Sequence, residues 1–194
     1  MNTDNKLKIH LISLAVIALI LLAGNIISSS SQQRILIYVS SFGFLALLSL
    51  IFVLMIPLLA KLKTNNLTTY LLENIKWIGI YAFVFASIHV FLVSNFLFEW
   101  DFAEIAENPY RILGILAFLI LALMTATSNK FSIQILGKNW KRIQNLIYIA
   151  LILVIIHSFN IGVIFMKNTA VKIIVLILAV LVIAKKIRYW KSSK

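Results

Sequence analysis

The sequence predicts an all-α membrane protein, built as a bundle of six transmembrane helices with both termini in the cytoplasm. Of the 194 residues, 62% are hydrophobic and only 12% are charged, and the mean hydropathy is +1.01. Soluble domains carry about twice that charged fraction. Apolar runs of about 20 residues, enough to cross the hydrocarbon of a bilayer, recur along the whole chain. We therefore expect a single multi-pass domain that covers residues 1–194.

The first three expected helices cover about 9–27, 35–59 and 77–98. The apolar run after Lys6 and Lys8 has no small-residue cleavage site behind it, so we expect a retained helix rather than a signal peptide. Pro57 is expected to kink or close the second helix. The Asn- and Thr-rich stretch 64–69 is expected to form a loop, with Lys76 at the edge of the third helix.

The last three expected helices cover about 112–127, 144–165 and 170–187. An acidic loop, residues 99–111, precedes the first of them and a basic loop, residues 130–142, precedes the second. Met166–Thr169 is expected to be a tight turn. The uninterrupted apolar part of the sixth helix is short, so Lys172 and Lys185 should extend toward opposite membrane surfaces.

The distribution of basic residues predicts the orientation. With six spans, all but four of the 18 Lys and Arg residues fall on the side of the two termini; the exceptions are Arg34, Arg111, Lys167 and Lys172. The positive-inside rule then places both termini in the cytoplasm. In a soluble chain the net charge of +12 would suggest nucleic acid, but here it follows topology. We expect the lipid bilayer, and no nucleic acid, as a partner.

Composition also excludes several functions. The chain has no cysteine, which excludes disulfides, thiol redox chemistry and iron–sulfur clusters. No Asp or Glu lies within an expected span, which argues against a proton-coupled transporter.

Two of the three histidines fall inside expected spans at matching depth. His89 lies 13 residues beyond Lys76 and His157 lies 15 residues beyond Arg142, on helices that both run outward. Both side chains are therefore expected in the outer half of the bilayer. Two neutral imidazoles at one depth can bind an iron from opposite faces, as in a bis-histidine haem b. The small residues Ala82, Ala86 and Ala150 precede the histidines at helical spacing and would leave room for a flat ring.

An alternative is that each histidine is a polar residue satisfied inside the bundle. Serines and asparagines nearby in the sequence are candidate partners: Ser87, Ser94, Asn95, Ser158 and Asn160. On this interpretation the chain is a haem-free polytopic membrane protein, such as a small-solute carrier or an assembly factor. The third histidine, His10, is interpreted as an interfacial residue at the inner edge of the first helix.

Four segments carry a resemblance to a known family: LMIPLLAKL, WIGIYAFVFASIHV, NPYRILGILAFLILALMTATS and LGKNWKRIQNLIYIALILVIIH. Together they resemble the ferric-reductase-like transmembrane family over roughly residues 40–160. Within it, the pattern is most similar to the haem-binding membrane subunits of bacterial periplasmic methionine sulfoxide reductase systems.

The resemblance implies that His89 and His157 ligate haem b. It also implies an electron-transfer component of an oxidoreductase system in the bacterial plasma (inner) membrane, rather than a self-contained enzyme. Electrons would come from a flavin reductase or a quinol and pass to a periplasmic reductase subunit or another external acceptor. FMN is a possible further cofactor.

The sequence departs from the family pattern at one position. The family has a further histidine 13 residues before the second ligand, in a Leu-His-Asn triplet, where this chain has Ile143-Gln144-Asn145. A glutamine side chain lacks the imidazole nitrogen that binds haem iron. We therefore expect one haem, not two, unless His10 replaces the missing ligand.

Arg111 is the expected partner of the haem propionates. It ends the acidic loop on the outer side, and its guanidinium suits a carboxylate bidentately. Tyr110 could add a hydroxyl donor. The alternative is an interfacial arginine paired with Glu107.

Overall fold

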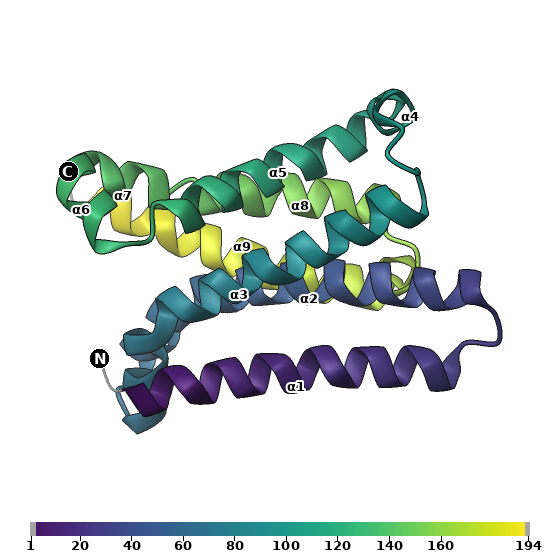
Figure 1. Ribbon diagram of the computed structural model, residues 1–194. Helices are drawn as coiled ribbons and strands as arrows, with labels where there is room; N and C mark the ends of the chain where they lie inside the picture. Colours follow the sequence, from purple (N-terminus) through teal and green to yellow (C-terminus); the bar gives the residue numbers. More distant parts are fainter. Residues whose placement is uncertain (1–2, 193–194) are drawn as a thin grey trace.

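The computed structural model describes the backbone of residues 3–192 and the side chains of residues 6–188. This part of the chain is helical and contains no strand. Figure 1 shows the elements, which are α1 (Thr3–Ile27), α2 (Ser31–Leu62), α3 (Asn66–Phe96), α4 (Phe102–Glu107), α5 (Pro109–Ala126), α6 (Lys130–Leu136), α7 (Lys138–Gln144), α8 (Ile147–Ile161), the 3₁₀ helix η1 (Phe165–Lys167) and α9 (Thr169–Ser192).

Five segments of the described chain are long and apolar enough to cross a membrane, which confirms the expected all-α membrane protein. They are Lys6–Ile27, Ser31–Leu62, Asn66–Phe96, Pro109–Ala126 and Lys138–Ile161. The helix α9 is not among them, although it has 24 residues. Charged residues near both of its ends, Lys172 on one side and Lys185 to Arg188 on the other, leave only a short apolar run between them. The sixth span therefore stays a prediction.

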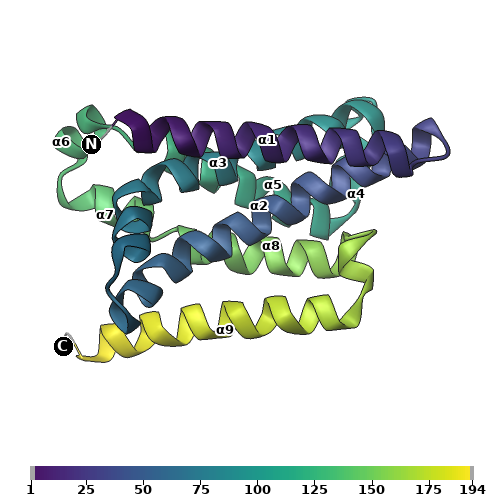
Figure 2. The ribbon, with the colours of Figure 1, turned by 90° about the horizontal axis from the view of Figure 1, so that it is seen from below.

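The spans associate as two antiparallel helix pairs, α2 with α3 and α5 with α8, which make the most extensive contacts in the fold. The helix α1 packs at the periphery against α2 and α3, and α9 runs beside α8 and α2 (Figure 2). The core lies where the two pairs and α9 meet. Its most buried members include Leu47 and Ile51 of α2, Leu151 of α8 and Val182 of α9.

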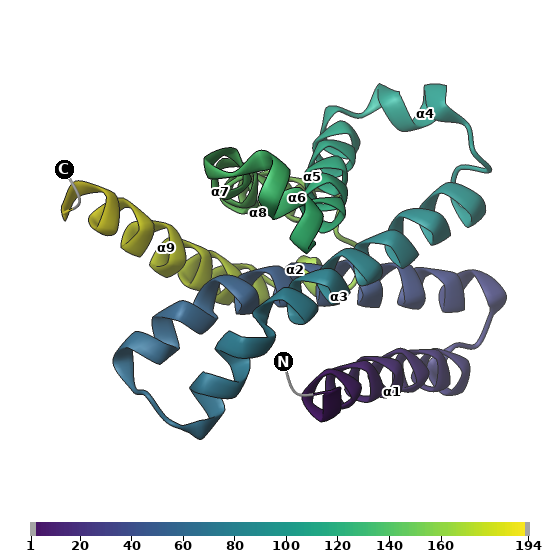
Figure 3. The ribbon, with the colours of Figure 1, turned by 60° about the vertical axis from the view of Figure 1, so that its left-hand side comes forward.

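The connection between α2 and α3 is much shorter than the expected loop. The helix α2 continues through Pro57 to Leu62, so the proline does not close it. Asn65 then caps α3: its side chain accepts the Thr68 N–H, and the Thr68 hydroxyl accepts the Asn65 N–H. This capping box supplies partners for N–H groups that have none within the helix, and it outweighs the polar composition of 64–69. Figure 3 shows this end of the pair extending away from the other helices.

The other polar segments also contain helices. The acidic loop holds α4, whose first turn is capped by the Asp101 carboxylate. The basic loop holds α6 and α7, which are joined at Gly137 with φ +50°, a backbone conformation that favours glycine. The fifth expected span is broken at Asn145–Leu146 and ends at Ile161 rather than Phe165. The 3₁₀ helix η1 covers Met166 and Lys167, the first half of the expected tight turn.

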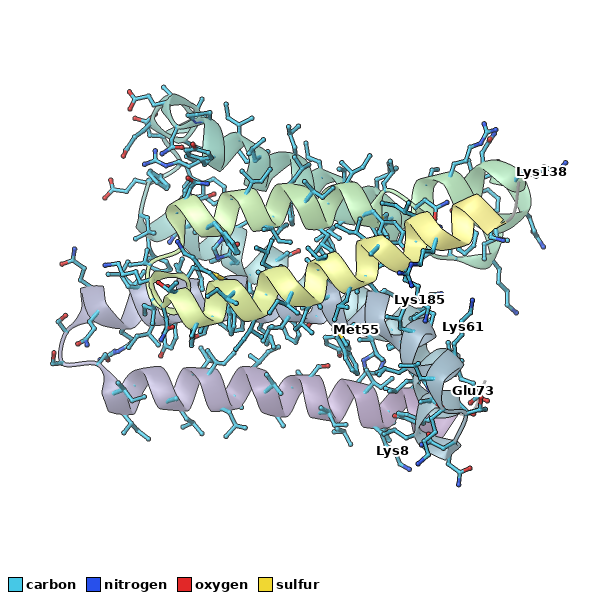
Figure 4. The ribbon with its side chains drawn as sticks, turned by 180° about the vertical axis from the view of Figure 1, so that it is seen from behind. Lys8, Met55, Lys61, Glu73, Lys138 and Lys185 are labelled. Atoms are coloured by element: carbon cyan, nitrogen blue, oxygen red, sulfur yellow. The ribbon has the colours of Figure 1, made fainter. Side chains whose placement is uncertain are left out.

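The two ends of the bundle differ in charge. The helix α1 begins and α9 ends at the end that also carries α6, α7 and the α2–α3 connection (Figures 1 and 2). Figure 4 shows Lys8, Lys61, Lys138 and Lys185 gathered there, and we call it the basic end. The opposite end carries α4 and the acidic residues around it, and we call it the acidic end.

Candidate functional site

The structure brings the rings of His89 of α3 and His157 of α8 next to each other in an edge-to-face arrangement. Their ring centroids lie 6.4 Å apart and their planes are inclined at 85°. The two helices belong to different pairs, so the rings meet where one pair packs against the other. The equal depth expected from the distances to Lys76 and Arg142 thus corresponds to a direct contact between the rings.

Each ring is anchored through its Nδ1 atom. His89 Nδ1 lies 2.9 Å from the carbonyl oxygen of Val39, and His157 Nδ1 lies 2.8 Å from that of Tyr110. A carbonyl oxygen can only accept, so Nδ1 carries the proton, and in the neutral ring Nε2 keeps its lone pair. Among the side chains that the structure describes, neither Nε2 has a hydrogen-bond partner. The site therefore offers two imidazole lone pairs from opposite helix pairs.

These residues fit a bis-histidine haem. Metal-bound histidines usually donate the other ring N–H to a carbonyl or carboxylate, as both rings do here. With metal–nitrogen bonds of about 2 Å, two imidazoles on opposite sides of one metal would have centroids about 6 Å apart, close to the observed separation of 6.4 Å. Within residues 6–188, no group of three or more His, Cys, Asp or Glu side chains could hold a metal ion. A two-histidine site suits a metal whose other ligands come from a macrocycle.

Four of the five polar neighbours suggested as alternative partners bond elsewhere, and the Nδ1 atoms of both rings bond to backbone carbonyls. Ser87, Ser158 and Asn160 each donate to a carbonyl of their own helix, and Asn95 accepts the indole N–H of Trp100. The interpretation that serine or asparagine side chains satisfy the histidines is therefore wrong; backbone carbonyls of the partner helices do so. The small residues Ala82, Ala86 and Ala150 are all buried, with 1%, 9% and 0% of their surface exposed.

The sequence interpretation missed two glycines that contact the rings. A Cβ added at Gly43 of α2 would lie 2.8 Å from His89 Nδ1, and one added at Gly114 of α5 would lie 2.7 Å from His157 Nδ1. Contacts this short do not occur for real Cβ atoms, so each ring packs against a surface that only glycine provides. Each glycine lies four residues after the accepting carbonyl, a spacing that is visible in the sequence only once the facing helices are known.

Arg111 and Tyr110 have partners that the sequence did not indicate. The Arg111 guanidinium donates to the Glu104 carbonyl at 2.6 Å and lies 4.3 Å above the Phe98 ring. It thereby ties α4 to the segment that follows α3, and these contacts replace the suggested pairing with Glu107. Tyr110 contributes its backbone carbonyl to the site, while its side chain is 38% exposed.

A cavity of about 580 Å³ opens in the basic half of the bundle, between α2, α3, α5, α8 and α9. Its lining includes five lysines: Lys61, Lys76, Lys130, Lys185 and Lys186. Its deep end reaches Ala82, seven residues before His89 and thus about 10 Å along α3.

Gln144 also lines this cavity, where the family pattern has its further histidine. Its amide nitrogen lies 3.3 Å from the Met124 carbonyl and 3.4 Å from the Thr127 hydroxyl, so it bonds the end of α5. His10 lies at the α1–α3 contact instead, with Nδ1 2.6 Å from the Tyr81 hydroxyl and its ring 5.3 Å from that of Trp77. The structure does not bring His10 and Gln144 together.

The fold and the paired rings define an integral membrane protein with a two-histidine site between two helix pairs. Residues 42–155, more than half of the chain, match the family model described as "Ferric reductase like transmembrane component". The chain belongs to the ferric-reductase-like transmembrane family. The matched region includes His89 and ends two residues before His157.

Similar curated proteins carry a more specific name. The "Protein-methionine-sulfoxide reductase heme-binding subunit MsrQ" of Salmonella paratyphi B is 34% identical over 112 residues, which is 52% of this chain and 55% of the relative. The same subunits of Salmonella newport and Salmonella heidelberg match with the same identity and coverage. The chain spans about half the length of the curated relatives that it matches.

Proposed function

We propose that this chain is a haem b-binding transmembrane electron-transfer subunit, with His89 and His157 as the axial ligands of the iron. The observation that carries the proposal is the pair of rings 6.4 Å apart, each with Nδ1 committed to a carbonyl. The MsrQ relatives, which are named heme-binding subunits, support it.

When bound, haem b supplies the one-electron chemistry of its iron. The chain's own residues hold and orient the two imidazoles at the contact of the helix pairs. The Val39 and Tyr110 carbonyls keep the proton of each ring on Nδ1, which leaves Nε2 as the metal-binding atom.

The first prediction concerns these ligands. The purified protein, expressed with haem precursor, should show a Soret band that shifts on dithionite reduction. His89→Ala and His157→Ala should each abolish the low-spin bis-imidazole spectrum, because a single imidazole leaves one axial position without its ligand. His10→Ala is the matched control and should keep the spectrum. A wild-type protein without a Soret band would favour the haem-free alternative, a carrier or assembly factor, and retention of the spectrum in both variants would refute the ligand assignment.

The different charges of the two ends of the bundle suggest where an electron donor and an electron acceptor would bind. We propose that electrons enter at the basic end from a quinol or a flavin reductase and leave at the acidic end to a periplasmic reductase subunit. The named function of the MsrQ relatives supports a partner of the methionine sulfoxide reductase type. The lysine-lined cavity at the basic end would also favour an anionic cofactor such as FMN.

The second prediction concerns the number of haems. Because Gln144 lacks an imidazole and bonds the end of α5, a pyridine haemochrome assay should give one haem per chain. Gln144→His should raise the number toward two if the cavity provides the opposite ligand, while Gln144→Asn should not. Two haems in the wild-type protein would contradict the prediction and make His10→Ala the next measurement.

The third prediction is the six-span topology with both termini in the cytoplasm, which is supported by the lysines at the basic end and by α1 beginning where α9 ends. The chain has no cysteine, so single-cysteine reporters have no background. In intact cells a membrane-impermeant maleimide should label Gln32→Cys and Lys167→Cys but not Asn66→Cys or Arg188→Cys. Labelling at position 188 would show that α9 does not cross the membrane.

The fourth prediction concerns Arg111, which we propose to be the cation nearest the haem propionates, with Tyr110 beside it. Arg111→Gln should lower the haem midpoint potential, because a positive charge near the ring favours the electron-rich ferrous state. Arg111→Lys keeps the charge and should stay near the wild-type potential. An unchanged potential in Arg111→Gln would limit Arg111 to its contacts with Glu104 and Phe98.

A further inference from the structure

We propose that Gly43 and Gly114 are positioning residues that fix the proton position and the plane of the two histidine rings. Each glycine forms part of a unit that we call a glycine clasp. The first clasp consists of the Val39 carbonyl, Gly43 and the His89 ring; the second consists of the Tyr110 carbonyl, Gly114 and the His157 ring. The inference rests on the proposed function for the role of the rings as iron ligands.

The close approach of each ring to its glycine is the first argument. At Gly43 an added Cβ would lie 2.8 Å from Nδ1 and 2.9 Å from Cε1 of His89. At Gly114 it would lie 2.7 Å from both the Nδ1 and the Cε1 atom of His157. The obstructed atoms belong to the edge of the ring that carries the Nδ1 proton. A side chain at either glycine would therefore displace that edge from its acceptor.

The position of the acceptor is the second argument. A carbonyl four residues before a helical glycine lies one turn away on the same face of the helix. That carbonyl oxygen has a second lone pair after accepting the helical N–H, so it can also accept from the ring. The ring can reach it at 2.9 Å for Val39, or 2.8 Å for Tyr110, only if the helix presents no Cβ in between. Glycine is thus what makes a backbone carbonyl usable as the partner of a ring on a neighbouring helix.

Repetition within one chain is the third argument. The two clasps have the same spacing between carbonyl and glycine, and they occur independently in the α2–α3 pair and the α5–α8 pair. The other four of the six glycines do not face a histidine: Gly24 faces Tyr38, Gly162 faces Met166, and a Cβ at Gly79 or Gly137 would meet nothing within 4 Å. Close approach to a glycine is thus not confined to the histidines, but Gly43 and Gly114 are the two glycines that a histidine ring approaches.

The clasps have consequences for a bound iron. Held by its Nδ1 proton, each ring cannot turn freely about its Cβ–Cγ bond, so the angle of 85° between the planes is maintained. In low-spin ferric iron, perpendicular imidazole planes bring the d orbitals closer in energy and raise the largest g value. The N–H···O=C bond also makes the imidazole a stronger donor, which stabilises the ferric state and lowers the potential.

The experiment compares three glycine-to-alanine variants of the full chain, purified with haem. Gly43→Ala and Gly114→Ala should each raise the midpoint potential and shift the largest g value in the electron paramagnetic resonance spectrum. Haem affinity should fall by roughly 10- to 100-fold, as is usual when the outer partner of a metal ligand is lost. Gly79→Ala is the matched control, since it makes the same change in a membrane helix where the added Cβ meets nothing within 4 Å.

The outcomes separate the clasps from the proposed function. Wild-type potential and g values in both Gly43→Ala and Gly114→Ala would overturn the clasps and leave the haem site standing. An equal loss of haem in Gly79→Ala would also overturn them, because the effect would then belong to any glycine in these helices. Haem loss in the two clasp variants alone supports the inference. A wild-type protein without bis-imidazole haem would overturn the proposed function itself.

A second measurement does not depend on iron. In the full chain labelled with ¹⁵N-histidine and prepared without haem precursor, nitrogen chemical shifts report which ring nitrogen carries the proton. Two of the three histidines should be Nδ1–H tautomers, and His89→Gln and His157→Gln assign their signals. Gly43→Ala should change only the His89 signal, and Gly114→Ala only that of His157. Nε2–H tautomers at both positions in the wild-type protein would overturn the clasps whether or not haem binds.

Discussion

A histidine ring in the hydrocarbon must place its N–H on an acceptor, and this constraint determines how the helices of this protein pack. An unpaired polar group costs several kcal/mol in lipid, where no water replaces the missing partner. Here the acceptors are the Val39 and Tyr110 carbonyls on the adjacent helices. Reaching them requires each pair, α2 with α3 and α5 with α8, to approach closely at Gly43 and Gly114. The register of both pairs and the meeting of the two rings therefore depend on the same contacts.

In the basic half of the bundle, hydrogen bonds to the C-terminal carbonyls of α5 hold the helices together. The last carbonyls of α5 have no partner within the regular helix. The hydroxyls of Thr127 and Ser128, which directly follow α5, supply partners, and side chains from α7 and its end add to them. Trp140 donates its indole N–H to the Thr127 carbonyl at 2.9 Å, and Gln144 reaches the Met124 carbonyl. Gln144 thus donates an N–H to a carbonyl at the end of α5. This contact needs a hydrogen-bond donor, whereas a metal ligand needs a lone pair. The same half remains open as the lysine-lined cavity.

The sequence predicted five of its six expected spans, because apolar length sets them, and the sixth stays a prediction. It also predicted that His89 and His157 lie at matching positions along their helices, counted from the basic residues Lys76 and Arg142, and the rings do meet. It did not predict that α3 begins at Asn66, since a capping box extends the helix through polar residues that composition assigns to a loop. The break at Asn145 was likewise hidden within a helical pattern. The glycines were missed for a different reason: their role depends on which helix faces which, and a single sequence contains no information on that. Arg111 was identified as a cation near the acidic end, but its partners depend on the path of the chain through α4.

The cavity shortens the distance between the basic end of the bundle and the single histidine pair. From Lys76 to His89 there are 13 residues, or about 20 Å of helix, which a donor at the membrane surface would have to bridge. The cavity reaches Ala82 and so shortens this separation along α3 to about 10 Å. Its lining is largely apolar at depth and lysine-rich toward the basic end, which suits a donor with a flat apolar body and a polar or anionic head. A molecule of that kind would occupy the half of the bundle where the family pattern has its further histidine. If the chain transfers electrons as proposed, that molecule itself would provide the inner part of the electron path, and Gln144 would be free to bond the end of α5.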